Sequence, residues 1–465
     1  MKRVTLSVFQ LGAAFLLIFT AFNSAGFIQE GVLQKLANSS YASGDASLDP
    51  AAGYTSLSII YATLTLCNLG AAPLVNLLST KWAMIAGALL YLLFLLAFVI
   101  RVMEWSLYLT SALLGFGASI LWTGQSVYVA QVSDHETIDK HTAIFSAMLQ
   151  IHSMCGGLFL YLAFPPDTRD VLCGLGIAVL ALLRPAETEP TYGPLPKTDS
   201  QEELIHLPSI GGASEEESRS EDGEEARSRP DSVGLQLYTD LVATFGIMLT
   251  RDMGLLLPSF AFLGLETAFW TGIYATSLIN TPHLHLPSNT TYALHAVSIG
   301  AGAFLGSSCC GWLKPVTQRR GRSPVVLLGL LLHLLAYFAA SRVLPDCAPL
   351  GCSHCAADGT CSAGLWQPTM GVVFGISFCL GLAGALWNTQ LAAFIGDVYK
   401  AKAAPAFAAS KFWGSLAAAA SFIALSKMAL SWQLLSYALA ATLAALTFIP
   451  AERHLMLTQN LSAKP

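Results

Sequence analysis

Charged residues are scarce in this chain of 465 residues. Asp, Glu, Lys and Arg make up 11% of the sequence, whereas 54% of it is hydrophobic. An ordinary soluble domain is roughly a quarter charged, so the composition excludes a string of soluble domains and predicts repeated passage through a membrane. The net charge is −5. The stretch from Glu187 to Arg229, with four basic and twelve acidic residues, supplies −8 of it, so the rest of the chain carries about +3, which is no electrostatic footprint for nucleic acid. We therefore expect a lipid bilayer around the chain and no nucleic-acid partner.

Catalytic and cofactor motifs are also missing. The sequence has no Walker lysine loop, no dinucleotide glycine pattern and no nucleophile elbow. His135-Glu136 with His141 has the outline of a metalloprotease helix. The second histidine, however, lies two residues too far along for both to bind one zinc ion. The sequence therefore predicts no enzyme, no cofactor and no metal site.

Apolar segments long enough to span a membrane occur about twelve times. Roughly 20 helical residues cross ~30 Å of hydrocarbon. With soft edges, the segments are 5–28, 53–79, 82–101, 105–131, 142–164, 169–184, 253–280, 291–313, 323–344, 367–397, 402–427 and 429–450. The sixth is short, and it needs a thinned bilayer or a truncated helix to cross.

A single long hydrophilic stretch separates the first six segments from the last six. Between Glu187 and Arg229 it holds twelve acidic and four basic residues and has no apolar period, so it should stay disordered in water. We predict a six-helix bundle at 1–184, a disordered acidic cytosolic linker at 185–251, a second six-helix bundle at 252–450 and a cytosolic tail at 451–465.

Basic residues indicate the orientation. With the N-terminus inside, eighteen Lys and Arg face the cytosol and five face outward, as the positive-inside rule favours. Both termini are then cytosolic. Asn38 and Asn289 start sequons in outer loops and should be glycosylated. Arg319, Arg320 and Arg322 are expected to act as a positive-inside anchor before the ninth segment.

Four of the ten cysteines cluster in the outer loop between the ninth and tenth segments. They are Cys347, Cys352, Cys355 and Cys361. With His354 among them they could hold zinc, but an oxidising compartment favours two disulfides, for which three connectivities are open.

Two charges lie within apolar segments. Glu266 is midway along the seventh, and Lys411 is about a third of the way into the eleventh. A charge at such depth costs at least ~2.5–3.5 kcal/mol unless it is paired or hydrated. A proton- or substrate-sensitive role and a fixed internal strut are both open.

The fourth and tenth segments share a short pattern. Leu-Trp-Thr-Gly-Gln at 121–125 resembles Leu-Trp-Asn-Thr-Gln at 386–390, which fits duplication of a six-helix unit but is also short enough to arise by chance. The amides and hydroxyl of Gln125, Asn388, Thr389 and Gln390 need partners within the membrane. They are expected either to form a polar solute site or to join helices.

Several short motifs, taken together, resemble one family. They are Phe-Thr-Ala-Phe-Asn at 19–23, Gly-Tyr-Thr-Ser at 53–56, Leu-Trp-Thr at 121–123, Gly-Leu-Glu at 264–266, Gly-Arg-Ser-Pro-Val-Val-Leu-Leu-Gly at 321–329, Asn-Thr-Gln at 388–390, Ala-Pro-Ala-Phe-Ala at 404–408 and Trp-Gln-Leu-Leu at 432–435. On these motifs, which run nearly end to end, the chain resembles the uncoordinated-93-like branch of the major facilitator superfamily.

The resemblance implies an all-α membrane protein with the major facilitator superfamily fold. That fold has twelve transmembrane helices in two six-helix pseudo-symmetric bundles, with helices 1, 4, 7 and 10 around a central cavity. Its helices 7 and 11 are neighbours, so we predict an ion pair between Glu266 and Lys411. The central-cavity candidates are Asn23, Gln125, Glu266, Asn388, Thr389, Gln390 and Lys411. The acidic–basic signature that latches the cytosolic side between helices 2 and 3 is absent, and Ser79-Thr80-Lys81-Trp82 replaces it.

Family members are either orphan transporters or accessory proteins, so the resemblance implies two functions. The first is a secondary transporter of a small polar or organic solute, with proton coupling through Glu266. The alternative is a non-transporting accessory subunit that regulates an ion channel or escorts a trafficking receptor. The missing latch favours the accessory role, and the intramembrane polar residues favour the transporter. We expect a transporter in the plasma membrane or in an endosomal or lysosomal membrane.

Overall fold

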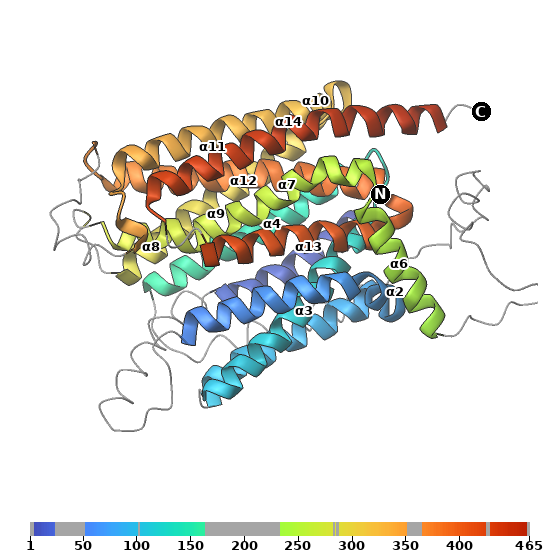
Figure 1. Cartoon of the computed structure of the whole chain (residues 1–465), viewed down its shortest axis with the longest axis horizontal. Helices are drawn as coiled ribbons and strands as arrows, with labels where there is room; N and C mark the ends of the chain where they lie inside the picture. The colour runs from blue at the N-terminus through green and yellow to red at the C-terminus, as the bar shows by residue number, and fades with distance from the viewer. Residues whose placement is uncertain are drawn as a thin grey trace, which may run out of the picture.

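The computed structural model describes residues 4–23, 52–100, 103–162, 233–281, 284, 288–350, 365–424 and 428–462. Over these ranges the protein is all-helical and contains no strand. Ten helices in the described ranges are long and apolar enough to cross a membrane, and they run side by side as a bundle (Figure 1). The predicted all-α membrane protein is confirmed. The count of twelve helices and the pseudo-symmetry stay predictions.

The helix boundaries lie close to the predicted apolar segments. The helices are an N-terminal helix at Val4–Asn23, α2 at Ala52–Ile100, α3 at Glu104–Val132, α4 at Ile138–Leu162, α6 at Val233–Met248, α7 at Arg251–Ala268, the π-helical turn η3 at Phe269–Ile273, α8 at Tyr274–Ile279, α9 at Ser288–Trp312, α10 at Lys314–Arg320, α11 at Ser323–Val343, η5 at Ala348–Leu350, α12 at Met370–Val398, η6 at Lys400–Lys402, α13 at Ala403–Ala424 and α14 at Leu430–Ser462. Helix α7 starts where the Thr250 hydroxyl accepts a hydrogen bond from the Met253 amide, an ordinary N-cap.

The longest segment, α2, holds two of the predicted spans. Ser79 interrupts it with φ 65° and ψ 155°, and a residue in that region turns the chain away from the helix axis. The part before Ser79 approaches α3 at Gly115, and the part after it approaches α3 at Gly117 and Gly124. The chain therefore folds back at Ser79, where the superfamily signature is missing, and both parts of α2 pack on α3.

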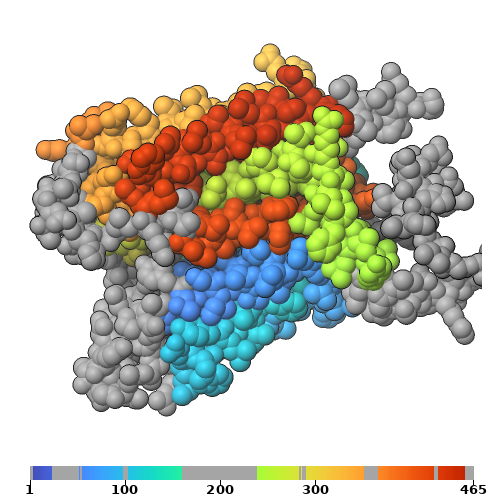
Figure 2. Space-filling model, viewed as in Figure 1, coloured from blue at the N-terminus to red at the C-terminus, as the bar shows by residue number. Residues whose placement is uncertain are grey.

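The middle of the chain differs from the prediction in one place. The sixth predicted segment, 169–184, and residues 185–232 of the predicted linker lie outside the described residues. The predicted linker extends to 251, but Val233–Met248 forms α6, so the disorder predicted there is wrong. The segment carries enough apolar residues to pack, because Ile247 is buried in a cluster that includes residues of α2 and α13. Figure 2 shows α6 on the surface of the bundle, beside α13 and α2.

Glycines let several helices approach backbone to backbone. A Cβ on Gly264 of α7 would lie 1.8 Å from the carbonyl oxygen of Gly414 on α13. A Cβ on Gly381 of α12 would lie 2.0 Å from the carbonyl oxygen of Ile299 on α9. Helices from before and after the undescribed stretch at 163–232 also meet, because α4 packs against α9 and α13 packs against α2. Close packing of this kind is how membrane helices associate without a hydrophobic driving force.

Candidate functional site

A small cavity with both polar and apolar lining residues lies between helices from the two sides of the undescribed middle stretch. Its walls come from α3 and α4, which precede residue 163, and from α12 and α13, which follow residue 232. Gln125, Asn388 and Lys411 line it together with the ring of Trp122. It leaves about 50 Å³ for the centres of water-sized molecules, which is room for a few waters or a small solute. The side chain of Asn388 is exposed in the middle of α12, where it lines the cavity.

Lys411 is the one charged residue among those that line this cavity. Its Nζ lies 5.4 Å from the centroid of the Trp122 ring, which allows a cation–π contact. Among the described residues, no carboxylate lies within 4.0 Å of that amine. One turn further along α13, the Ser415 hydroxyl accepts hydrogen bonds from Thr65 at 3.1 Å and from Asn68 at 3.2 Å, and these bonds fix the helix against α2.

The predicted ion pair between Glu266 and Lys411 is not formed, so that prediction is wrong. Helices α7 and α13 are neighbours as expected, and they touch where Gly264 meets Gly414. Glu266 follows Gly264 by two residues, or about 200° of helical rotation, and its carboxylate therefore points away from α13. The carboxylate packs instead against Gly384 of α12, where a Cβ would lie 2.5 Å from Oε1.

Glu266 belongs to a buried cluster with His333 and Tyr337 of α11. Its Oε1 lies 4.0 Å from His333 Nε2, and both side chains are at most 8% exposed. His333 Nδ1 is 2.9 Å from the carbonyl oxygen of Gly329. Nδ1 must carry the ring proton because a carbonyl only accepts, so Nε2 is bare in the neutral ring. Within the described residues, His333 Nε2 and the Tyr337 hydroxyl have no hydrogen-bond partner. The cluster therefore places a carboxylate 4.0 Å from an imidazole nitrogen that has no hydrogen-bond partner among the described residues.

Besides Glu266, three predicted cavity residues lie elsewhere. Asn23 ends the N-terminal helix and is not among the cavity-lining residues. Thr389 and Gln390 follow Asn388 on α12, but they are 1% and 0% exposed and lie beside Cys310 of α9. Successive helix positions are turned by 100°, and in this run only Asn388 faces the cavity.

The predicted glycosylation and disulfide residues are mostly not described. Asn38 lies outside the described residues, and Asn289 lies in the first turn of α9 without a described side chain. Cys347 is disulfide-bonded. Cys352, Cys355 and Cys361 lie outside the described residues, so the pairing stays open.

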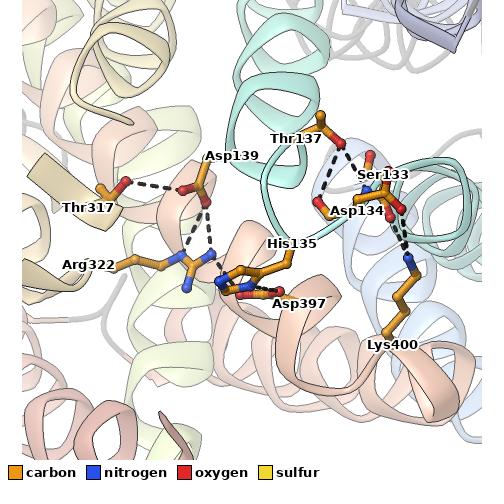
Figure 3. Close-up of polar contacts among 9 residues, drawn as sticks. All are labelled: Ser133, Asp134, His135, Thr137, Asp139, Thr317, Arg322, Asp397 and Lys400. Carbon is orange, nitrogen blue, oxygen red and sulfur yellow. Dashed lines mark hydrogen bonds and ion pairs between the residues drawn. The ribbon is translucent and has the colours of Figure 1, made fainter. Parts of the chain in front are cut away.

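A network of charged and polar side chains lies at the start of α4, next to the cavity residue Ile138 (Figure 3). Arg322 Nη2 donates to Asp139 Oδ1 at 2.9 Å and to Asp397 Oδ2 at 3.2 Å. Thr317 donates to the other oxygen of Asp139 at 3.1 Å, and His135 Nδ1 lies 2.6 Å from Asp397 Oδ1. We call His135, Asp139, Thr317, Arg322 and Asp397 the end network.

The end network joins helices from both sides of the undescribed middle stretch. Asp139 is in the first turn of α4, and its neighbour Ile138 lines the cavity. Arg322 caps the start of α11, and Asp397 is in the last turn of α12. Lys400 adds a further link, because its Nζ donates to the carbonyl oxygen of Ser133 at 2.6 Å. The network therefore begins beside a cavity residue and holds α4 to α11 and α12.

Most side chains of the end network are buried, but that of His135 is exposed. The side chains of Arg322, Asp139 and Asp397 are 4%, 7% and 5% exposed, whereas that of His135 is 70% exposed. Of the three arginines predicted to act as a positive-inside anchor, Arg322 is buried in this network, whereas Arg319 and Arg320 are exposed; the anchor role itself stays a prediction. The Glu452 carboxylate of α14 holds Arg322 in place, because it accepts hydrogen bonds from the amides of Arg322 and Ser323 at the start of α11.

Sequence comparisons agree on one family. A family model described as "Ion channel regulatory protein UNC-93" matches residues 44–449. UNC93-like protein MFSD11 from Xenopus tropicalis is 30% identical over 447 residues, which cover 93% of each chain. UNC93-like protein 3 from Arabidopsis thaliana is 26% identical over 443 residues, 90% of this chain and 80% of that one. Protein unc-93 homolog A from Mus musculus is 25% identical over 442 residues, 88% and 84% of the two chains.

Proposed function

Because the chain belongs to the UNC-93 family, as its motifs predicted, we propose that it is a secondary transporter of a small polar or organic solute. The observation that supports this function is the cavity between helices from the two sides of the chain, which has polar lining residues and an ionic network beside it. A transporter that opens to each side in turn needs a central site and a closure that can break and re-form. A fixed structural scaffold needs neither of them.

The end network has the properties of such a closure. It consists of charged side chains that meet across the helices, and water could solvate every one of them if the helices separated. It also replaces the latch that the superfamily places between helices 2 and 3, which is absent here. By the predicted orientation, the loops at 133–137, 313–322 and 399–402 are cytosolic, so the end network would close the cytosolic end. The membrane would be the plasma membrane or an endosomal or lysosomal one.

Proton coupling belongs to the same proposal. Gly384, which contacts Glu266, lies one helical turn before the cavity residue Asn388 on α12. The carboxylate therefore sits about 5–6 Å along that helix from the cavity. An ionisable residue within a membrane is a functional candidate when its partner can share a proton, and His333 is placed to do so. Protonation of the Glu266–His333 site would then accompany movement of the solute.

Reconstituted vesicles test the proposal. Untargeted metabolite analysis is applied to vesicles with the wild type and to vesicles without protein, after incubation with a mixture of small solutes. At least one solute should accumulate only with the protein, and Gln125→Leu or Asn388→Leu should reduce its entry at least tenfold. The exposed surface variant Gln318→Leu is the matched control and should transport like the wild type. Accumulation that is unchanged in both cavity variants contradicts the proposed route.

The accessory role is the second candidate, because the matching family is described as an ion channel regulatory protein. It predicts that the vesicles accumulate no solute. It also predicts that the chain co-purifies from membranes with a channel or receptor, and that Gln125→Leu and Asn388→Leu leave this association intact. Solute flux that depends on Gln125 and Asn388, together with the absence of a stably bound channel or receptor, supports the transporter over the accessory role.

A further inference from the structure

We propose that the cavity binds a small organic anion with one carboxylate, and that Lys411 is the residue that recognises it. This inference rests on the proposed function, because it names the charge and class of the transported solute. Its first support is the charge of the cavity lining. Fourteen residues line the cavity, and Lys411 alone among them is charged. No acidic side chain is available there to receive the ammonium group of a cationic solute.

The missing partner of Lys411 is the second support. A lysine within a membrane is costly without a counter-charge, and a cation–π contact such as that with Trp122 contributes only ~0.5–2 kcal/mol. No carboxylate of the described residues lies within 4.0 Å of Nζ. The nearby acidic residue that sequence reasoning assigned to it, Glu266, is turned toward His333. An anion in the cavity would supply the counter-charge that the protein lacks.

The remaining lining selects an organic anion over an inorganic one. Gln125 and Asn388 offer amide N–H groups, and the hydroxyls of Thr142 and Ser146 can also donate, so a carboxylate has several donors besides the ammonium group. The ring of Trp122 provides a flat apolar surface, and the rest of the wall is apolar. These wall residues are Val129, Ala130, Ile138, Phe145, Leu149, Ala392 and Phe407. A carboxylate with a short carbon body meets both kinds of surface.

The volume of the cavity and the single charge of Lys411 narrow the class of solute further. The cavity leaves about 50 Å³ for water-sized molecules, which corresponds to a few non-hydrogen atoms. One lysine balances one negative charge, so a monocarboxylate fits better than a dicarboxylate. If one proton enters at Glu266 with each anion, the net charge that crosses the membrane is zero.

Thermal unfolding of the purified full chain in detergent tests the inference on the wild type first. The probes are acetate, lactate and pyruvate, each compared with its neutral amide, with ethanolamine and with sodium chloride. A ligand that binds only the folded state raises the unfolding temperature as its concentration rises. We expect a saturating rise with at least one carboxylate and none with its amide, with ethanolamine or with chloride. Equal stabilisation by the amide, or by chloride alone, would overturn the inference.

Variants assign the effect to Lys411. Lys411→Met should fold, since it removes a buried charge, and should weaken carboxylate binding at least tenfold. Lys411→Arg keeps the charge and should bind within tenfold of the wild type. Lys402→Met, at an exposed position just before α13, is the matched control and should bind like the wild type. Undiminished carboxylate binding by Lys411→Met would also overturn the inference.

The vesicle experiment separates this inference from the proposed function. Carboxylate binding through Lys411 without any solute flux supports the anion site and refutes transport. Flux of neutral or cationic solutes only, without carboxylate binding, supports transport and refutes the anion site. Flux of carboxylates that Lys411→Met abolishes supports both.

Discussion

Arg322 offers the sharpest test of the end network. Arg322→Met keeps most of the side-chain volume and removes the positive charge between Asp139 and Asp397. Both carboxylates are then left with side-chain exposures of 7% and 5% and without their arginine. Removal of one partner from a buried pair typically costs ~3–5 kcal/mol. His135 cannot replace the arginine, because it is 70% exposed and contacts only Asp397.

The energetic cost of Arg322→Met should destabilise the closed conformation, in which the helices meet at this end. If the helices separate at this end, water reaches Asp139 and Asp397, and the penalty disappears. A difference of ~3–5 kcal/mol shifts a two-state equilibrium by a factor of about 10² to 10³ or more. We therefore expect Arg322→Met to open the end network, and we expect unfolding of the whole chain to be a smaller effect.

Distance measurements between spin labels can detect the opening. Labels attached through non-canonical residues at the exposed positions Lys140 and Gln318 lie on the two sides of the network. The wild type should give mainly the short distance, and Arg322→Met should give mainly a longer one. Arg319→Met changes an exposed arginine three residues away and is the matched control. Identical distance distributions in Arg322→Met and the wild type would refute the role of the network as a closure.

Three further predictions address packing, proton coupling and orientation. Gly381→Ala places a Cβ 2.0 Å from a carbonyl oxygen of α9 and should lower the unfolding temperature by several degrees. Gly375→Ala, on the same helix, is the control: an added Cβ there would have nothing within 4 Å, so the unfolding temperature should not change. Equal effects of the two changes would contradict the close packing of α12 on α9. Glu266→Gln should leave solute exchange intact in vesicles but abolish its stimulation by a pH gradient; a wild-type response argues against proton coupling at the Glu266–His333 site. A glycosidase should increase the gel mobility of the protein through removal of sugar at Asn38, and a tag in the linker that is reachable on intact cells contradicts the orientation.

Much of the fold could be predicted because apolar length is a strong signal. The described helices match the predicted segments to within a few residues in most cases, and α2 contains two of them across Ser79. Helix α6 was the exception. Its apolar residues follow directly after the acidic stretch, and composition alone does not show at which residue that stretch ends.

The residues of the cavity could be predicted only in part. Gln125, Asn388 and Lys411 line it as expected, since polar residues within spanning helices must face something polar. Which neighbour they face depends on rotation about the helix axis, and sequence alone does not give that rotation. The repeated pattern at 121–125 and 386–390 shows the limit: Trp122 lines the cavity, whereas Trp387 is fully buried against Phe262.

The end network could not be assembled from sequence because its members lie at the ends of helices that are far apart in the chain. Asp139 and Asp397 each stand near the end of an apolar segment, where a charged residue normally contacts water. Only packing of α4, α11 and α12 shows that they meet at Arg322. One feature of the sequence could have indicated these residues: side chains of opposite charge lie at helix ends that are predicted to be on the same side of the membrane.

Access to the cavity from each side of the membrane tests the central claim most directly. Asn388→Cys, in a variant whose free cysteines are changed to serine or alanine, places a thiol in the cavity. Its modification rate is measured with a membrane-impermeant thiol reagent added to one face of oriented vesicles or to the other. A transporter should be modified from both faces, and Arg322→Met should accelerate the reaction from the face that bears the end network. Modification from one face only in both variants, or from neither face, would contradict a transporter that opens its cavity to each side in turn.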